Sequence, residues 1–374
     1  MSIRRTAAVL AIAALTFAAC SGGASNSPSA AASTGAGAST AASAGASTTA
    51  AACKVGVAWS TFQEERYGLR DEPGIKAALT AGGATYIGND AKNNADTQAS
   101  NVATLLAAGV NVIVINAYDP DAILPSVKAA VDAGIPVIAY DRELENAKAL
   151  FLTHDNILVG HMIADAVTKA QPTGNYAIIK GDKTQTNPIF LRQGMEEVIA
   201  PLLASGAIKI PTGAEVFTDQ WKADLAQTEM EQILTANNNK IDAVLSENDN
   251  MATGAVAALK AQGLDKTVKI GAQDGDKFAL NRVALGTQVV SVWKDATELG
   301  TAAGKAALEL CKNPDFSKVT GAVAAKTTKG LDTYHLFLKP IPITKDNLQV
   351  VLDAKWITKA ELCKDVTAGS VTGC

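Results

Sequence analysis

Charged and amide side chains follow the predicted strands of this chain at the point where each strand ends. Arginine, carboxylate and amide groups each form hydrogen bonds in pairs, and charged partners shorten and strengthen those bonds. Such groups suit a neutral ligand with neighbouring hydroxyls, because each hydroxyl both donates and accepts. The candidate binding residues are Arg66, Asp141, Arg142, Gln185, Asn187, Asn248, Asp274 and Lys294, and the same loops also carry Glu64, Glu65, Asp182 and Asp249.

An aromatic platform would complete such a site, because the C–H face of a sugar ring is apolar and packs flat on an indole. Trp221, one of four tryptophans, is our candidate for this platform. Each residue also has a purely structural alternative. The polar side chains could cap loops or form surface ion pairs, and Trp221 could be a core residue. The set taken as a whole favours ligand binding over these alternatives.

Motifs typical of enzymes are missing from the sequence. There is no G-x-G-x-x-G after the first predicted strand, no G-x-S-x-G and no P-loop. His154, His161 and His335 form no H-E-x-x-H or similar ligand set, and the cysteine spacings match no zinc pattern. Asp141 and Asp274 could be an acid–base pair, but their separation cannot be read from the sequence. We therefore expect no catalysis, no cofactor and no metal.

The elements that must position these residues alternate between strands and helices from residue 54 onward. Near-continuous apolar runs separated by helices are typical of parallel strands that are covered on both faces. Right-handed crossovers then give a doubly wound α/β fold, in which ligands bind beyond the carboxyl ends of the strands. The predicted strands include 55–59, 85–88, 112–116, 137–140, 176–180, 243–246, 268–272 and 288–293, and the predicted helices include 97–108, 122–133, 163–170 and 251–262.

The composition agrees with an α/β protein of two domains. The 374 residues are 48% hydrophobic and 5% aromatic, which is enough to bury a core in each domain and argues against an all-β sandwich. Lys and Arg number 33 against 37 Asp and Glu, so the net charge is −4 and nucleic-acid binding is not expected. The apolar content excludes a wholly disordered chain, and no apolar run approaches the ~20 residues of a membrane-spanning helix.

The first 53 residues are predicted to direct export and to form a tether. Arg4 and Arg5 precede an apolar stretch at 7–19, which is typical of a signal peptide over residues 1–19. The residues that end at Cys20 resemble a bacterial lipobox, so we expect Cys20 to be lipidated. An ordinary signal peptide followed by a chance cysteine is the alternative. Residues 20–53 are almost entirely Ala, Ser, Gly and Thr, which predicts a flexible tether with a span of ~30 Å. The expected location is the outer face of the cell membrane, or the periplasm.

Four cysteines remain once Cys20 is set aside. An even number outside the cytoplasm suggests two disulfides, for which three connectivities are possible. We predict Cys53–Cys311, because the first strand begins beside Cys53 and a helical pattern that starts at Lys294 should end at the same distal edge of the domain. We predict Cys363–Cys374, because these two lie close together near the C-terminus, where a closed loop anchors the chain end.

Several short motifs occur together between residue 54 and the C-terminus. They are Glu65-Arg66, Ala139-Tyr140-Asp141-Arg142, Asp155-Asn156, TANNNKIDAV at 235–244, Asn248-Asp249, AQGL at 261–264, GAQD at 271–274 and GTQ at 286–288. As a set they resemble the bacterial type I periplasmic sugar-binding proteins, in particular the D-xylose-binding members. A single Asn-Asp or Tyr-Asp-Arg would mean little, but the whole set is specific.

The resemblance implies two doubly wound lobes joined by a hinge of three crossing segments. The first lobe would hold residues 54–156 and 294–335, and the second 157–293 and 336–374. A monosaccharide would lie between the lobes, with Trp221 stacked on its ring and Arg66, Asp141, Arg142, Asn187, Asn248, Asp274 and Lys294 on its hydroxyls. Gln185 departs from the pattern, because the xylose binders have an aspartate there, so the exact sugar stays open.

The implied function is capture of D-xylose, or of a related aldopyranose such as glucose, by a monomer that closes like a hinged clamp and delivers the sugar to an ABC importer. A sugar receptor for a chemotaxis or sensor system is the alternative, and an exported carbohydrate-active enzyme is a more distant one. A repressor of similar fold is disfavoured, because no helix-turn-helix precedes residue 54 and the chain carries an export signal.

Overall fold

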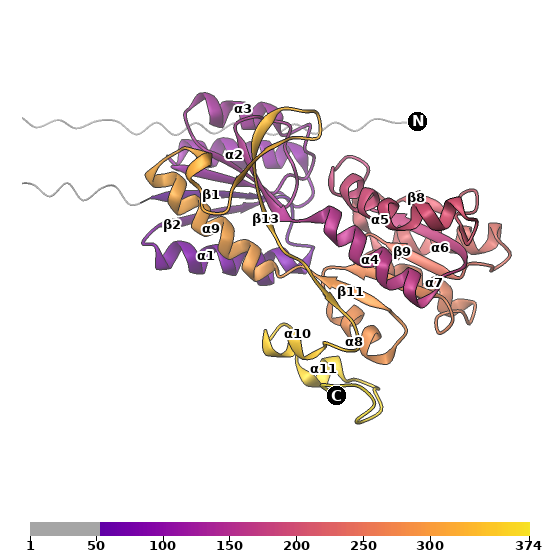
Figure 1. Cartoon of the computed structure of the whole chain (residues 1–374). Coiled ribbons are helices and arrows are strands. Elements are labelled where there is room, and N and C mark those ends of the chain that lie inside the picture. The colour runs from indigo at the N-terminus through magenta and orange to yellow at the C-terminus, as the bar shows by residue number, and fades with distance from the viewer. Residues whose placement is uncertain (1–52) are drawn as a thin grey trace, which may run out of the picture. The chain divides into compact units, whose positions relative to one another are not determined.

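Two sheets organise the computed structural model, which describes residues 53–374 (Figure 1). The first sheet has the strand order β12-β13-β5-β4-β3-β1-β2. All its pairs are parallel except β12 with β13. The strands are β1 (Lys54–Trp59), β2 (Thr85–Asp90), β3 (Val112–Ile115), β4 (Val137–Tyr140), β5 (Ala149–His154), β12 (Val323–Lys326) and β13 (Asp332–Leu338).

The second sheet has the order β14-β11-β10-β9-β6-β7, with β8 also paired to β6. Its pairs are parallel except β14 with β11. The strands are β6 (Gly174–Lys180), β7 (Ile208–Lys209), β8 (Glu215–Phe217), β9 (Ala243–Ser246), β10 (Lys269–Gln273), β11 (Val290–Trp293) and β14 (Ile341–Ile343). Each sheet with its helices forms one lobe of the structure.

Helices cover the sheets of both lobes. The first lobe has a π-helix η1 (Tyr67–Asp71), α1 (Glu72–Ala81), α2 (Ala95–Ala107), α3 (Leu124–Asp132), α9 (Ala296–Lys312) and the short η3 (Phe316–Lys318). The second lobe has α4 (Asn156–Ala170), α5 (Asn187–Ala204), η2 (Asp219–Trp221), α6 (Ala223–Ala236), α7 (Asp249–Ala261), α8 (Lys277–Leu285), α10 (Gln349–Asp353) and α11 (Lys359–Leu362).

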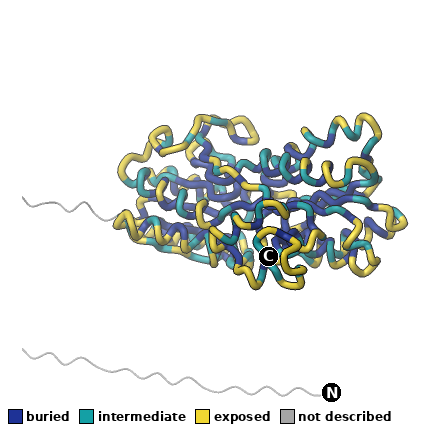
Figure 2. Tube along the Cα trace, turned by 60° about the horizontal axis from the view of Figure 1, so that its bottom comes forward, coloured by how far each residue is buried: buried dark blue, intermediate teal, exposed yellow. Residues whose placement is uncertain are grey.

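Continuous apolar runs explain why the central strands lie inside. Every residue of β3, β4, β5, β9 and β11 is buried. Figure 2 shows the same pattern along the trace, with buried segments inside and exposed segments at the periphery. A strand with two buried faces needs helices on both sides, which is the doubly wound arrangement. The predicted fold class, two doubly wound α/β lobes, is confirmed.

Close helix packing in the second lobe depends on two glycines that face each other. A Cβ on Gly160 of α4 would lie 2.1 Å from the carbonyl oxygen of Leu191 in α5. A Cβ on Gly194 of α5 would lie 2.0 Å from the carbonyl oxygen of Ile157 in α4. Any side chain at either position would push the helices apart, so these glycines set the distance between α4 and α5.

Three segments connect the lobes, as the hinge prediction requires. The first passes through Asp155, which caps α4 by accepting from the Leu158 N–H, and the second passes through Asp295, which caps α9 in the same way. The third follows β13, which pairs with β5 as far as Leu338 opposite His154. The first lobe therefore continues to Leu338, beyond the predicted boundary at residue 335, because the hydrogen-bond ladder of β13 does not end there.

Both disulfides have the predicted pairing. Cys53, at the start of β1, is joined to Cys311 near the end of α9, and Cys363 is joined to Cys374. The predicted signal peptide, Cys20 and the tether up to residue 52 lie outside the described residues. Within residues 53–374, no helix combines the length and apolar character that crossing a membrane requires.

Candidate ligand-binding site

A small cavity lies between the two lobes, at the carboxyl ends of their strands. Its lining comes from the carboxyl ends of β1, β4, β6, β8, β9, β10 and β11 and from the loops and helix starts that follow them, where an open parallel sheet binds ligands. The lining residues are Glu64, Arg66, Tyr67, Asp141, Arg142, Gln185, Asn187, Trp221, Asn248, Gln273, Asp274 and Lys294. Every predicted binding residue is among them, so the structure brings the whole predicted set together.

Three lining residues were not among the predicted binding residues. Glu64 lies in the loop after β1 that the sequence singled out, and Tyr67 begins η1 directly after Arg66. Gln273 is the last residue of β10 and immediately precedes Asp274. Their positions at the end of a strand, or one residue from a candidate, are the signal that would have found them.

A broader hollow lies beside β12 and β13, but charged residues of its lining are exposed to solvent. Its lining includes Lys148, Asp315 and Lys326, and the Lys326 side chain is 63% exposed. Charges at such a surface are screened by water and hold a ligand weakly. Most residues of the cavity between the lobes are instead buried, so we assign the site there.

Arg66 occupies the first-lobe side of the cavity and is held from behind by Asp71. Its Nε and Nη2 donate to the two carboxylate oxygens of Asp71 at 3.2 and 2.9 Å. Its Nη1 lies 3.6 Å from an Asp141 oxygen and 4.0 Å from an Asp274 oxygen. Burial alone would lower the pKa of Arg66, but Asp141 and Asp71 outweigh it and raise the pKa well above its usual value. Arg66 is therefore a fixed, charged donor.

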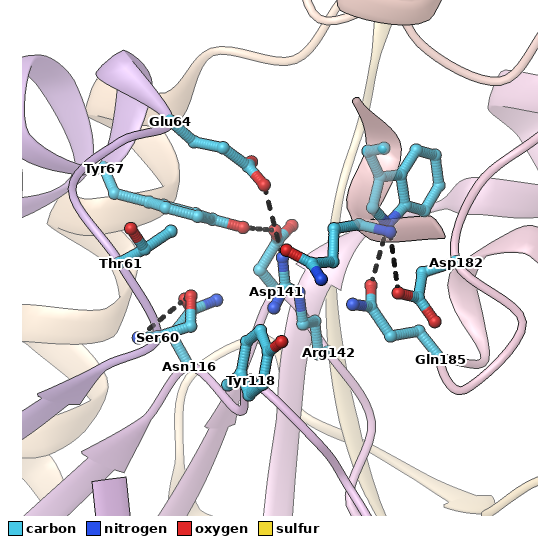
Figure 3. A network of polar contacts seen from close by, with 12 residues as sticks. Ser60, Thr61, Glu64, Tyr67, Asn116, Tyr118, Asp141, Arg142, Asp182 and Gln185 are labelled. Carbon is cyan, nitrogen blue, oxygen red and sulfur yellow. Dashed lines mark hydrogen bonds and ion pairs between the residues drawn. The ribbon is translucent and has the colours of Figure 1, made fainter. Parts of the chain in front are cut away.

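Asp141 is the central carboxylate of the site. It lies directly after β4 with a φ of 64°, a left-handed conformation that turns its side chain out of the strand direction. The Tyr67 hydroxyl donates to it at 2.9 Å (Figure 3). The Lys294 ammonium is 4.0 Å away. Burial would raise the pKa of Asp141, but Arg66, Lys294 and Arg142 together lower it below its usual range. Asp141 is thus an ionised acceptor across the ordinary pH range.

Arg142 follows Asp141, also lines the cavity, and is buried. Its Nη1 donates to the carbonyl oxygen of Ala117 at 2.7 Å, and its Nη2 lies 3.5 Å from a Glu64 oxygen. Figure 3 shows Glu64 extending toward Arg142 from the loop after β1. Arg142 is therefore fixed by contacts with two other loops of the first lobe.

Trp221 forms the second-lobe wall and is oriented by Gln185. The indole Nε1 donates to the Gln185 side-chain oxygen at 3.0 Å. A Cβ on Gly181 would lie 2.1 Å from the six-membered ring, so the ring packs directly on the backbone of this glycine. Because the indole N–H can only donate, it fixes which end of the Gln185 amide is the oxygen. The Gln185 amide N–H groups are then available to a ligand.

In Asn248, too, the amide oxygen is bound by the protein and the amide N–H groups are left for the cavity. It caps α7, and its oxygen accepts from the backbone N–H of Met251 at 2.8 Å. Its amide N–H groups remain for the cavity.

Asp182, which follows β6, is used within its own loop, because its oxygens accept from the backbone N–H groups of Thr184 and Gln220. Asp182 therefore supports the loop, and it does not line the cavity.

Three buried oxygens on cavity residues lack a hydrogen-bond partner among the described residues. They belong to Asn187, Gln273 and Asp274. The other atom of the Asn187 amide donates to the Asp141 carbonyl oxygen at 2.9 Å, which links the two lobes, and the Asp274 oxygen lies 3.6 Å from Lys294 Nζ. Buried polar atoms nearly always have a partner, so three acceptors in one cavity indicate a ligand that donates hydrogen bonds.

The charges around the cavity balance. Arg66, Arg142 and Lys294 are opposed by Glu64, Asp141 and Asp274, so three cations face three carboxylates. An uncompensated ligand charge would be costly in such a buried place. Residues 53–374 contain no group of three or more His, Cys, Asp or Glu that could hold a metal ion. The arrangement suits a small neutral molecule that carries several hydroxyls.

Comparison with known proteins gives a consistent result. The family described as periplasmic binding protein domain matches residues 55–315. The D-xylose-binding periplasmic protein of Escherichia coli (strain K12) is 35% identical over 298 residues, which are 79% of this chain and 88% of that protein. The protein of the same name from Haemophilus influenzae is 32% identical over 297 residues, 79% of this chain and 87% of that one. A solved ABC transporter solute-binding protein from Clostridium phytofermentans, with bound β-D-glucose, shares the fold with a TM-score of 0.75 at 24% identity, covering 83% of this chain and 99% of its own.

Proposed function

The chain belongs to the family of periplasmic binding proteins, and from this premise we propose that it captures a monosaccharide between its two lobes. The sugar would be D-xylose or a related aldopyranose such as D-glucose. The protein would deliver it to an ABC importer and would catalyse no reaction. Binding would shift the chain from an open to a closed population, which is the form that a permease can recognise.

The observation that carries the proposal is the set of unpartnered acceptors in a charge-balanced cavity. The oxygens of Asn187, Gln273 and Asp274 need donors, and sugar hydroxyls are donors. The amide N–H groups of Gln185 and Asn248 need acceptors, and the same hydroxyls accept. Each hydroxyl can therefore satisfy groups of both kinds at once, which a carboxylate or an ammonium ligand could not do.

Trp221 adds the apolar contact that distinguishes a sugar from a smaller polyol or an inorganic ion. Its ring is packed on Gly181 on one side and lines the cavity on the other. A pyranose ring presents C–H groups that pack on an aromatic face in this way. The relatives named above are described as D-xylose-binding, which supports a pentose or hexose as the ligand.

Anchoring outside the cytoplasm is part of the same proposal. The signal-like residues 1–19, Cys20 and the Ala-, Ser-, Gly- and Thr-rich residues that follow support an exported lipoprotein. A tether would hold the binding body near a membrane importer while it samples the surrounding solution. We propose that the body acts as a monomer.

Calorimetry on the purified protein tests the proposal. D-xylose, D-glucose, D-galactose and D-ribose are titrated separately, and the recovered sugar is analysed by mass spectrometry and NMR. We expect saturable binding of at least one pentose or hexose at one molecule per chain, with the sugar recovered unchanged. Binding of none of these sugars, or conversion of one of them to a product, would contradict the proposal.

A further inference from the structure

The C-terminal segment after β14 is attached to the second lobe by several independent contacts. The Cys363–Cys374 disulfide closes its last loop. Lys277 of α8 forms an ion pair with Glu361 at 2.8 Å, and the Asn281 amide donates to the carbonyl oxygens of Leu362 and Lys364. This segment therefore moves with the second lobe.

Trp356 is the residue of this segment that approaches the cavity. It is 8% exposed and packs in an apolar cluster with Leu280, Trp293 and Ile343. Its Nε1 donates to the Gly275 carbonyl oxygen at 2.6 Å, and its ring meets Trp293 edge-on at 5.4 Å. Gly275 follows Asp274 and Trp293 precedes Lys294. Trp356 thus contacts the chain neighbours of Asp274 and Lys294, the two charged residues that the second lobe and the hinge bring to the cavity.

Arg70 approaches Trp356 from the other lobe. It lies on η1, beside Asp71 and one helical turn after Arg66. Its Nη2 donates to the Trp356 carbonyl oxygen at 2.8 Å. Its guanidinium carbon lies 4.7 Å from the centre of the Trp356 ring. A charge-assisted hydrogen bond and a cation–π contact therefore join the same two residues across the gap between the lobes.

The contacts of Arg70 join it to the second lobe and not to its own. Among residues 53–374, Arg70 has no ion pair, and its one side-chain hydrogen bond is the bond to Trp356. Arg66, which directly precedes η1, is by contrast paired with Asp71 within its own lobe. The side chain of Arg70 is thus positioned for a partner that is in reach when the lobes are close together.

We propose that Arg70 and Trp356 form a latch that stabilises the closed form and couples closure to the placement of Asp274 and Lys294. The latch rests on the proposed function, because it acts on the same cavity, but it touches no ligand. When the lobes close, Arg70 engages Trp356, and Trp356 in turn fixes the Gly275 carbonyl and the Trp293 ring. Loss of the latch lowers the closed population, and the apparent affinity for every ligand falls by the same factor.

The test compares Arg70→Gln with the wild-type chain, using D-xylose and D-glucose as probes. We expect the dissociation constant to rise about tenfold, and by the same factor for both sugars. The dissociation rate should account for the rise, and the association rate should be unchanged. Arg70→Lys, which keeps the cation but not the planar fork, should restore part of the affinity.

Arg192→Gln is the matched control. Arg192 pairs with Glu196 and Glu215, both within the second lobe, so its loss should leave affinity and dissociation rate at the wild-type values. Affinities of Arg70→Gln within twofold of wild type for both sugars would overturn the latch, and so would an affinity loss matched by an equal loss in Arg192→Gln.

Failure of the proposed function gives a different pattern. If neither sugar binds the wild-type chain, the assignment of a sugar ligand is wrong, and small-angle scattering of the ligand-free proteins then decides the latch. A larger radius of gyration in Arg70→Gln than in wild type and Arg192→Gln supports it. Equal radii in all three proteins overturn it.

Discussion

Several residues in the cavity have one side fixed by the protein and one side left for a ligand. The Asp71 carboxylate holds Arg66, the Arg66 guanidinium faces Asp141, and the Tyr67 hydroxyl fixes the Asp141 oxygen. Gln185 and Asn248 both give their oxygens to protein donors. Because these groups are held from behind, a ligand meets them already in position, and less conformational entropy is lost on binding.

Trp221→Ala is expected to weaken sugar binding by about 2–4 kcal/mol, because it removes a large apolar contact from a desolvated cavity. The loss, more than tenfold in affinity, should be similar for every sugar that binds, since an indole contacts a ring face and not one hydroxyl. Trp221→Phe keeps an aromatic face on Gly181 but loses the bond to Gln185, and should keep most of the affinity. Calorimetry measures both.

The sugar-free melting temperature is the control for this prediction, because Trp221 also belongs to the apolar cluster of the second lobe. A marked fall in melting temperature without a fall in sugar affinity would show that Trp221 is a core residue and not a stacking platform.

Gln185→Asp is expected to change the ranking among sugars, with D-xylose gaining relative to D-glucose by about 1–2 kcal/mol. The amide offers N–H donors to the cavity, because its oxygen accepts from Trp221, whereas a carboxylate offers acceptors. Gln185→Glu is the matched variant, since it keeps the side-chain length and the acceptor for Trp221. An unchanged sugar ranking in both variants would contradict a ligand contact at Gln185.

At the scale of helices and strands, the sequence predicted what apolar periodicity encodes. The strands at 112–116 and 137–140 appear as β3 and β4 with ends within one residue, because buried parallel strands are continuous apolar runs. The edge strand β12 is largely exposed and lacks such a run, so no pattern revealed it. The site residues could be predicted as one group because they follow strands, and open parallel sheets bind ligands beyond the carboxyl ends of their strands.

Other features could not be read from the sequence for a physical reason. The Gln185–Trp221 bond and the contact of Arg70 with Trp356 join residues far apart in the chain, and neither has a local signature. The boundary at Leu338 depends on how far β13 pairs with β5. Such features are set by tertiary packing, which local patterns do not contain.

His154, at the first hinge segment, is expected to make the stability of the fold depend on pH. It ends β5, its ring is buried, and neither ring nitrogen has a hydrogen-bond partner among residues 53–374. Burial lowers the pKa of His154 well below its usual value, and the nearby Lys294 and Arg66 lower it further, against Asp141. Below about pH 6.5 the unfolded chain therefore binds a proton that the folded chain does not, and stability falls as the pH decreases.

His154→Gln should flatten this dependence. We expect the wild-type free energy of unfolding to lose up to about 2 kcal/mol between about pH 7 and about pH 5 through His154, a loss that the variant lacks. Urea titrations across that range measure it. His161→Gln, on the exposed side of α4, is the control, and a variant slope equal to that of wild type would contradict the role of His154.

The two disulfides should differ in what they contribute. Cys53 and Cys311 are separated by 258 positions, and Cys363 and Cys374 by 11. Because a longer closed loop restricts the unfolded chain more, removing the first bridge should cost about 5–6 kcal/mol and removing the second about 3 kcal/mol. Urea unfolding of the paired Cys→Ala variants tests this order, and an equal or reversed order would contradict the loop argument.

The whole molecule combines a closing body with a chain that we expect to hold it near a membrane. In this structure the lobes are joined by direct contacts, such as the Asn187 amide on the Asp141 carbonyl oxygen and Arg70 on Trp356. These contacts all lie within residues 53–374. The predicted tether precedes β1, which begins at Lys54 on the end of the first sheet opposite the cavity. A tether attached there would leave the cavity and both lobes free to open and close.

Cys20→Ala is expected to release the protein from the membrane. An acyl chain contributes about 0.8 kcal/mol for each buried methylene, and two chains are needed for stable anchoring, which a lipidated cysteine would supply. On detergent partitioning, wild type should enter the detergent phase and Cys20→Ala the aqueous phase. Ser21→Ala, which alters the neighbouring residue but keeps the cysteine, is the matched control and should behave as wild type.

The mass of the mature N-terminal peptide gives an independent readout, because lipidation adds the mass of the acyl groups to Cys20, whereas an ordinary signal peptide leaves an unmodified residue. A Cys20→Ala protein that still partitions with detergent would show that the tether does not depend on this cysteine. Since the variant leaves the body from Lys54 onward unchanged, its sugar affinity should equal that of wild type, so that anchoring and binding are measured separately.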